Sequence, residues 1–194
     1  MNIQSDFQHL LRIVTLGESS VGKTSIINRL MNKSFDNLYQ PTVGATFVLH
    51  EEYVDDNKVE MQIWDTAGQE QYKSLSPIYC RNAAAAIIIF DITNHESFLK
   101  LDEWLQLIKN ASNTEPILFI AANKSDLIDS RKVSEIEMNE YSTKRNIPIF
   151  YTSAKNGDGI DELFQKIAKE IVDKGFVLPV ENTIKKNETN YCFC

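Results

Sequence analysis

The sequence predicts an α/β fold, a mostly parallel six-stranded sheet flanked by helices. Apolar runs of strand length alternate with segments of helical periodicity, which is the pattern of a parallel sheet whose connections are helices. Two of the runs are apolar throughout, as expected for strands that are covered on both faces. The six expected strands cover residues 11–16, 46–53, 59–64, 83–90, 117–122 and 148–152.

The segments between these strands carry signals of their own. Asp55-Asp56-Asn57 are turn residues, so the second and third strands are expected to form a hairpin. Residues 25–31 are typical of a helix, and Ser134 with Glu137 fits a capping box that begins a later helix. Gly175 is the expected stop of the last helix. Helical spacing predicts two further apolar faces, one formed by Phe98, Leu101, Leu105 and Ile108 and one by Ile160, Leu163, Phe164, Ile167 and Ile171.

Length, composition and charge narrow the class of protein. The chain has 194 residues, 43% of them hydrophobic, which suits one compact domain with appendages. The start of the chain lacks the pattern of a signal peptide, and no apolar run approaches the length of a membrane span. The net charge of −7 argues against a general nucleic-acid binder.

The cysteines and histidines do not suggest a structural framework. Cys192 and Cys194 lie at the end of the chain, so a disulfide framework is not expected and a reducing, cytosolic compartment is. Cys80 is expected to be an inert, partly buried thiol. The three histidines, His9, His50 and His95, show no metal-ligand spacing and are assigned no role.

The first motif predicts a phosphate site. Residues 17–24, Gly-Glu-Ser-Ser-Val-Gly-Lys-Thr, fit G-x-x-x-x-G-K-[ST] and stand between an expected strand and helix, as this motif requires. Gly17 and Gly22 let the backbone approach an anion closely. Lys23 supplies a positive charge, and the Thr24 hydroxyl is an oxygen ligand for Mg²⁺. The residues expected to contact nucleotide here are Ser19, Ser20, Val21, Gly22, Lys23, Thr24 and Ser25.

A second motif follows the third strand. Asp65 can hold Mg²⁺ directly or through a water, and Gln69 can orient an attacking water. Gly68 has no side chain, so its N–H can approach a terminal phosphate. Taken alone, these residues are also ordinary turn formers; the phosphate loop makes the functional interpretation the stronger one.

A third motif can select the base. Asp126 can accept hydrogen bonds from guanine N1–H and the exocyclic amine, groups that adenine does not present there, so the discrimination is sharp. Asn123 can meet N7, and the stem of Lys124 can lie over the ring. Ser153-Ala154-Lys155, after the last strand, can add a backbone donor to O6. All three motifs follow strands, and ligands of such sheets bind at the carboxyl ends of the strands.

Two other classes share some of these features. A metabolic kinase would also carry the phosphate loop, but it needs a second substrate pocket and has no use for residues 123–126. A nucleotide-locked scaffold would keep the fold and lose Gln69 or Thr42, and both are present.

These motifs resemble those of a small GTPase of the Ras superfamily, a P-loop NTPase small G domain. The resemblance covers residues 11–174 and implies binding of GTP and GDP with Mg²⁺, and slow GTP hydrolysis that needs an activating protein. Thr42 resembles the first-switch threonine, which makes Thr24, Thr42 and Asp65 the expected metal ligands and Gln69, Lys23 and Thr42 the expected catalytic residues. Phe35 sits where the family packs an aromatic ring against the guanine edge.

Within that superfamily the chain is similar to Rab proteins, with features of the early-endosomal branch. The segments 58–64, 72–79, 90–93 and 123–127 carry this similarity. It implies regulation of vesicle traffic, endocytic or secretory, and a surface triad for effectors formed by Phe47, Trp64 and Tyr79. It also implies an exchange factor, a GTPase-activating protein and a monomeric G domain.

The expected organisation is a short extension (1–9), a G domain (10–175) and a flexible hypervariable tail (176–194). The tail ends in Tyr191-Cys192-Phe193-Cys194, which is not a C-a-a-X box. It matches the Cys-x-Cys ending of Rabs, which implies geranylgeranyl groups on Cys192 and Cys194. The expected location is therefore the cytoplasmic face of endosomal or other vesicle membranes, with a cytosolic pool extracted by a lipid-shielding chaperone.

Overall fold

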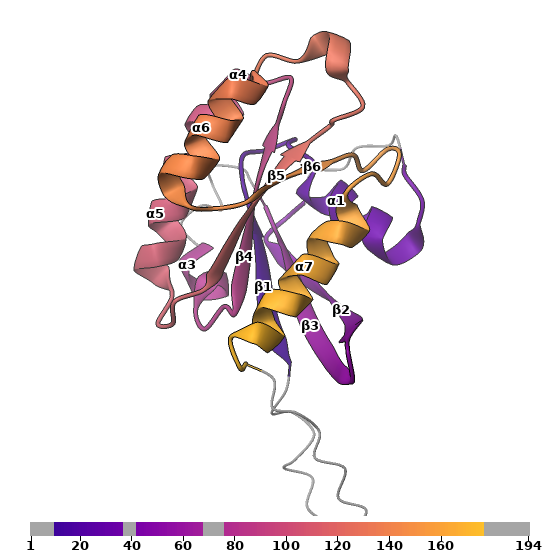
Figure 1. The fold of residues 1–194 in the computed structure, drawn as a ribbon, viewed down its shortest axis with the longest axis vertical. Helices are drawn as coiled ribbons and strands as arrows, with labels where there is room; N and C mark the ends of the chain where they lie inside the picture. The colour runs from indigo at the N-terminus through magenta and orange to yellow at the C-terminus, as the bar shows by residue number, and fades with distance from the viewer. Residues whose placement is uncertain (1–9, 37–41, 68–75, 177–194) are drawn as a thin grey trace, which may run out of the picture.

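Within the part of the chain that the structure describes, six strands form a single sheet in the order β2-β3-β1-β4-β5-β6. The computed structural model describes residues 10–36, 42–67 and 76–176. Only the β2–β3 pair is antiparallel, and the other four pairings are parallel. The predicted mostly parallel six-stranded sheet with flanking helices is confirmed (Figure 1). The strands are β1 Leu11–Leu16, β2 Ala45–Val54, β3 Asn57–Thr66, β4 Ala85–Asp91, β5 Ile117–Asn123 and β6 Ile149–Thr152.

Helices cover both faces of this sheet (Figure 1). Side chains of α1 and α7 share one buried cluster with the sheet, and those of α4, α5 and α6 share the other. None of the described helices is long and apolar enough to cross a membrane. The helices are α1 Lys23–Asn32, α3 Ser76–Cys80, α4 His95–Leu99, α5 Leu101–Ala111, α6 Glu135–Arg145 and α7 Ile160–Asp173, with a short 3-10 helix, η1, at Ile128–Ser130.

The central strands are buried on both sides because their side chains alternate between the two clusters. In β4, Ile87 and Ile89 face α1 and α7, whereas Ile88 and Phe90 face the other helices. This explains why the strand is apolar from Ala85 to Phe90, before it ends at Asp91.

Both predicted apolar helix faces are buried. The face that begins at Phe98 is carried by two helices, α4 and α5, which meet at Lys100. The backbone stays in the right-handed helical region there, with φ −80° and ψ −5°, so the same face continues across the junction into α5. The predicted face of α7 is carried by one uninterrupted helix.

The predicted turns and helix ends are also confirmed. Val54 pairs with Asn57 across the hairpin, and Asp55 adopts the left-handed conformation with φ +52°. At the end of α7, Gly175 has φ +73°, and the Phe176 N–H donates to the Ile171 carbonyl at 3.1 Å. This geometry satisfies a carbonyl that the last helical turn leaves open.

The capping box at the start of α6 is present. The Glu137 N–H donates to the Ser134 Oγ at 3.2 Å, and the Ser134 N–H donates to a Glu137 carboxylate oxygen at 2.9 Å. Hydrogen bonds from His95 and from Ser134 lower the pKa of Glu137 to about 2. Because the pKa is depressed, the ionised carboxylate stabilises the fold fully above pH 4.5, its ordinary value, and that contribution is lost as the pH falls towards 2.

The described cysteine, Cys80, and the described histidines, His50 and His95, have surroundings that fit structural roles. Cys80 was expected to be partly buried, but the structure buries it completely. Burial raises the pKa of its thiol to about 12, which fits the expected inert thiol. The ring of His50 pairs with Glu52 and that of His95 with Glu137. Over the part of the chain that the structure describes, no group of three or more His, Cys, Asp or Glu side chains could hold a metal.

We expect Ser134→Ala to lower the free energy of unfolding by about 1 kcal/mol, because the first turn of α6 loses its side-chain acceptor. Ser134→Asp, which keeps an acceptor oxygen, is the matched control and should remain within a few tenths of a kcal/mol of the parent. Urea denaturation of the three proteins measures the difference. An equal loss in both variants would show that the cap does not stabilise α6.

Candidate functional site

The loop between β1 and α1 lies directly against the ends of two other strands. Gly17 has φ +142°, and a Cβ built on it would stand 2.2 Å from the carbonyl oxygen of Ile89. Gly22 has φ +99°, and its Cβ would stand 2.3 Å from Nδ2 of Asn123. Neither position has room for a side chain, so both glycines of the motif are required by packing as well as by conformation.

The Lys23 side chain binds backbone carbonyl groups of this loop. It is only 6% exposed, and its ammonium group donates to the carbonyl oxygens of Gly17 and Glu18, each at 2.8 Å. Burial lowers the pKa of Lys23 to about 8, while the charges of Asp65 and Glu18 oppose that shift. The ammonium is thus held at the loop, where a bound phosphate would restore its preference for the charged form.

The three predicted metal ligands come together although they are far apart in sequence. The Thr24 hydroxyl donates to Oδ2 of Asp65 at 2.7 Å, and its oxygen lies 2.7 Å from the hydroxyl oxygen of Thr42. Asp65 is 5% exposed. Burial raises its pKa, against a smaller opposing effect of the hydrogen bond from Thr24.

This cluster has the chemistry that a Mg²⁺ site requires. Among the described residues, Asp65 Oδ1 is buried and has no hydrogen-bond partner, so the carboxylate is one contact short. A carboxylate beside two hydroxyl groups is an all-oxygen donor set, which is the kind Mg²⁺ prefers. The side chains of Thr24, Thr42 and Asp65 therefore fit such an ion.

The predicted base-recognition residues are also assembled at one place. Ser153 donates its hydroxyl proton to Oδ1 of Asp126 at 2.7 Å, and Nζ of Lys155 lies 4.0 Å from Oδ2 of the same carboxylate. The Ser153 N–H donates to the Asp158 carbonyl at 3.0 Å. The loops after β5 and β6 are therefore joined at the carboxylate that is expected to recognise guanine.

Asn123 connects this region to the phosphate loop. Its Nδ2 donates to the Val21 carbonyl at 2.7 Å, and its Oδ1 accepts from the Thr152 hydroxyl at 3.3 Å. The residue is 1% exposed. The structure thus gives Asn123 a bridging position that the sequence did not predict, beside its predicted contact with N7.

A family model described as "Ras family" matches residues 12–173 of this chain. The chain belongs to the Ras family. It is accordingly a small GTPase of the Ras superfamily, a nucleotide-dependent switch. The match spans every described residue expected to contact nucleotide, and membership of this family decides against the metabolic-kinase alternative.

Two contacts with residues of the site were not predicted from the sequence. The Asp91 carboxylate, at the end of β4, lies 2.5 Å from the ammonium group of Lys124, a residue with a φ of +65°. The indole N–H of Trp104 donates to Glu18 of the phosphate loop at 3.1 Å. A carboxylate that ends an otherwise apolar strand was a usable signal for Asp91, whereas nothing local marks Trp104.

The three aromatic residues of the expected effector surface form one continuous stack. Ring centroids of Phe47 and Trp64 are 5.3 Å apart, and those of Trp64 and Tyr79 are 5.4 Å apart. Phe47 is 49% exposed, and the other two are half-buried. Phe35 is described and exposed. Gly68, Gln69, Cys192 and Cys194 lie outside the described residues.

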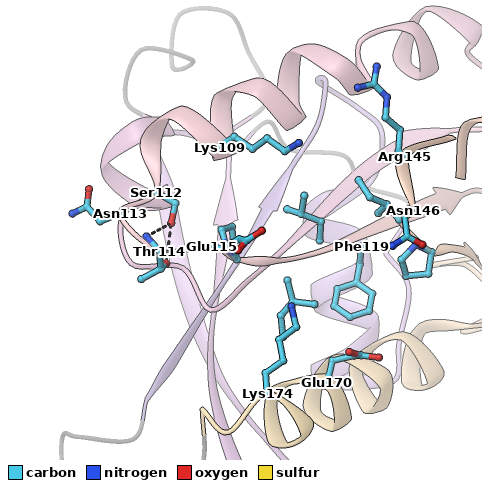
Figure 2. Close-up of a pocket in the computed structure, with 15 residues that line it drawn as sticks. Lys109, Ser112, Asn113, Thr114, Glu115, Phe119, Arg145, Asn146, Glu170 and Lys174 are labelled. Atoms are coloured by element: carbon cyan, nitrogen blue, oxygen red, sulfur yellow. Dashed lines mark hydrogen bonds between the residues drawn. The ribbon is translucent and has the colours of Figure 1, made fainter. Parts of the chain in front are cut away.

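A cavity of about 920 Å³ lies at the opposite edge of the sheet (Figure 2). It is lined by the start of β5, the end of α5 and residues such as Arg145 and Lys174. Phe119, the lining residue of β5 nearest to Asn123, precedes it by four residues, which is ~13 Å along a strand at about 3.3 Å per residue. None of the predicted site residues lines it, so this cavity is separate from the nucleotide site.

We expect Gly22→Ala to lower the free energy of unfolding by roughly 3 kcal/mol, because the new methyl group would meet Asn123 in a strained backbone conformation. Gly175→Ala is the matched control, since Gly175 also has a positive φ but nothing within 4 Å of its Cβ position. It should cost only about 1 kcal/mol. Equal losses in guanidinium denaturation would show that conformation alone, and not the contact with Asn123, matters at Gly22.

Proposed function

We propose that this GTPase is a Rab-like switch that cycles between GTP and GDP and recruits effectors to regulate vesicle traffic. The observation that carries the proposal is the assembly of two sets of residues at one edge of the sheet. Lys23, Thr24, Thr42 and Asp65 gather where phosphates and a metal would lie, and Asp126 with Ser153 gathers where a base would lie. Asn123 joins the two sets.

In this proposal different residues of the chain have different roles in GTP hydrolysis. Lys23 holds the terminal phosphates through its buried ammonium group, and Gln69 orients the water that attacks the γ-phosphate. Thr24, Thr42 and Asp65 would hold Mg²⁺, which neutralises charge on the phosphate oxygens when bound. Hydrolysis without an activating protein is expected to be slow.

The switch follows from how Thr42 and Asp65 are connected to the aromatic surface. Trp64 directly precedes Asp65, and in the β2–β3 ladder Thr46 pairs with Asp65 and Phe47 with Trp64. We infer that two switch segments, from about Phe35 to Val43 and from Gly68 to Ser76, are held by Thr42 and the Gly68 N–H only while the γ-phosphate is present. Loss of these bonds would disturb the start of β2 and with it the surface formed by Phe47, Trp64 and Tyr79.

We expect the protein to bind GDP and GTP tightly and to show no measurable competition by ATP. Asp126→Asn should shift the preference from guanine towards xanthine, because an amide donor then faces the carbonyl that xanthine carries in place of the amine. Competition of fluorescent GDP by GTP, ATP and XTP measures both effects. Asp129→Asn, a nearby exposed carboxylate, is the control and should change neither preference. Comparable binding of ATP to the parent protein would contradict the guanine assignment.

The proposed location is the cytoplasmic face of an endocytic or other vesicle membrane, with a cytosolic pool. The sequence similarity to Rab proteins and the terminal Cys-x-Cys support it. One lipid chain gives only marginal membrane binding, whereas two give stable anchoring. Lys185 and Lys186 add little electrostatic attraction, so two geranylgeranyl groups on Cys192 and Cys194 would provide most of the affinity. A lipid-shielding chaperone would extract the protein, and an exchange factor and an activating protein would set its nucleotide state.

We expect the double variant Cys192→Ser/Cys194→Ser to remain in the soluble fraction of cell lysates while its GDP affinity stays at the parental value. Cys80→Ser is not a suitable control, because it would disturb the core. We use Ser142→Ala, which lies about 50 residues before the terminal cysteines. The control should fractionate with membranes as the parent does. A double variant that still pellets with membranes would refute the proposed anchor.

A further inference from the structure

Arg29 joins three carbonyl groups that belong to two distant parts of the chain. This half-buried residue stands in α1. Its Nε donates to the Ala154 carbonyl at 2.7 Å, and a terminal nitrogen donates to the Lys155 carbonyl. The other terminal nitrogen donates to the Lys33 carbonyl, just after α1, at 2.7 Å. A single guanidinium group thus fastens the loop after β6 to the end of α1.

The same helix begins at the phosphate loop. Lys23 and Thr24 form the start of α1, and Arg29 follows Lys23 by six residues, which is about 9 Å along a helix. Figure 1 shows α1 beside α7, with the loop after β6 above them. The helix that carries the phosphate and metal contacts therefore also holds the loop of the base-recognition residues.

Arg29 is the partner of the two loop carbonyls that follow Ser153. Ser153 is secured by its hydrogen bonds to Asp126 and to the Asp158 carbonyl. Ala154 and Lys155, the next two residues, have their carbonyl oxygens bound by Arg29. The peptide that carries the Ala154 N–H stands between two held groups: its own Ser153 carbonyl accepts from the Gly157 N–H at 2.7 Å, and the Ala154 carbonyl of the next peptide accepts from Arg29.

We propose that Arg29 is a positioning residue for guanine recognition, which acts by orienting the Ala154 N–H towards the 6-oxygen of the base. This inference rests on the proposed function, in which residues 153–155 supply a backbone donor to O6; because the Ser153 N–H already donates to Asp158, the inference assigns that donor to Ala154. Three carbonyls in fixed directions require the planar fork of an arginine, whereas the single ammonium of a lysine cannot reach all of them. The position is therefore specific for arginine and not merely for positive charge.

The test compares release of two nucleotides from Arg29→Lys. GDP is one, and 6-thio-GDP is the other, which keeps N1–H and the 2-amine for Asp126 but replaces the 6-oxygen with sulfur, a weak acceptor. Dissociation rates are measured by chasing ribose-labelled fluorescent nucleotides with excess unlabelled GDP. We expect GDP release to become about tenfold faster and 6-thio-GDP release to change less than about threefold, because the lost contact is worth one hydrogen bond with the 6-oxygen only.

Arg12→Lys is the matched control. It also removes a guanidinium bond to a backbone carbonyl, that of Arg81 at 3.0 Å, but at the opposite end of β1. Both release rates should match the parent. Arg29→Gln provides a second variant of the same site and should reproduce the difference between the nucleotides if Arg29→Lys does not fold.

The outcomes separate this inference from the proposed function. Equal acceleration of both nucleotides would make Arg29 a general clamp on α1 and would overturn its role in base recognition, as would unchanged rates. Those results leave the parental preference for GDP over ADP in place. Absence of that preference in the parent would instead refute the proposed function.

Discussion

The absence of space beside the loop between β1 and α1 is the constraint on which the rest of the site depends. The backbone at Gly17 lies against the Ile89 carbonyl, and the backbone at Gly22 lies against the Asn123 side chain. Through these contacts the ends of β4 and β5 support the loop directly. The start of α1, and with it Lys23 and Thr24, is consequently placed by the centre of the sheet, which is the most buried part of the molecule.

Without a ligand, the buried charges of Lys23 and Asp65 at this edge of the sheet lower the stability of the fold. Burial shifts the pKa of Lys23 downwards and that of Asp65 upwards, so the same low-polarity surroundings disfavour both charged forms. The two groups reduce this cost for each other only in part. A phosphate for Lys23 and a divalent cation for Asp65 would offset it, and a ligand that binds the folded chain alone stabilises the fold by linkage. The same buried charges therefore contribute both to the affinity for the ligand and to the stability of the ligand-bound fold.

The position of the aromatic surface follows from strand register. Because successive residues of a strand alternate between faces, a metal ligand at Asp65 places Trp64 on the opposite side of β3. The antiparallel ladder then sets Phe47 opposite Trp64, and Tyr79 completes the stack from α3. A change at the nucleotide site has a short path to this surface, through the peptide bond between Trp64 and Asp65 and the strand pairing of Trp64 with Phe47.

Local patterns in the sequence were sufficient for the six strands and the longer helices, although not for α3 and η1; the site residues named from the sequence stay predictions. The strands, the hairpin turn at Asp55, the capping box at Ser134 and the stop at Gly175 depend on neighbours within a few residues, so spacing alone predicts them. The convergence of Thr24 and Asp65 was predictable because carboxyl ends of parallel strands share an edge. Roles of Gln69 and of the terminal cysteines are predictions from sequence.

Only the tertiary structure decided which long-range partners hold the site in shape. Arg29 contacts carbonyls about 125 positions away, Trp104 reaches Glu18 across 86, and Asp91 meets Lys124 from the neighbouring strand. Backbone carbonyls are the same at every residue, so the sequence around Arg29 carries no mark of the loop that it binds. Local propensity and periodicity determine where a helix or strand forms; the packing of those elements on the sheet determines which groups then come within hydrogen-bonding distance.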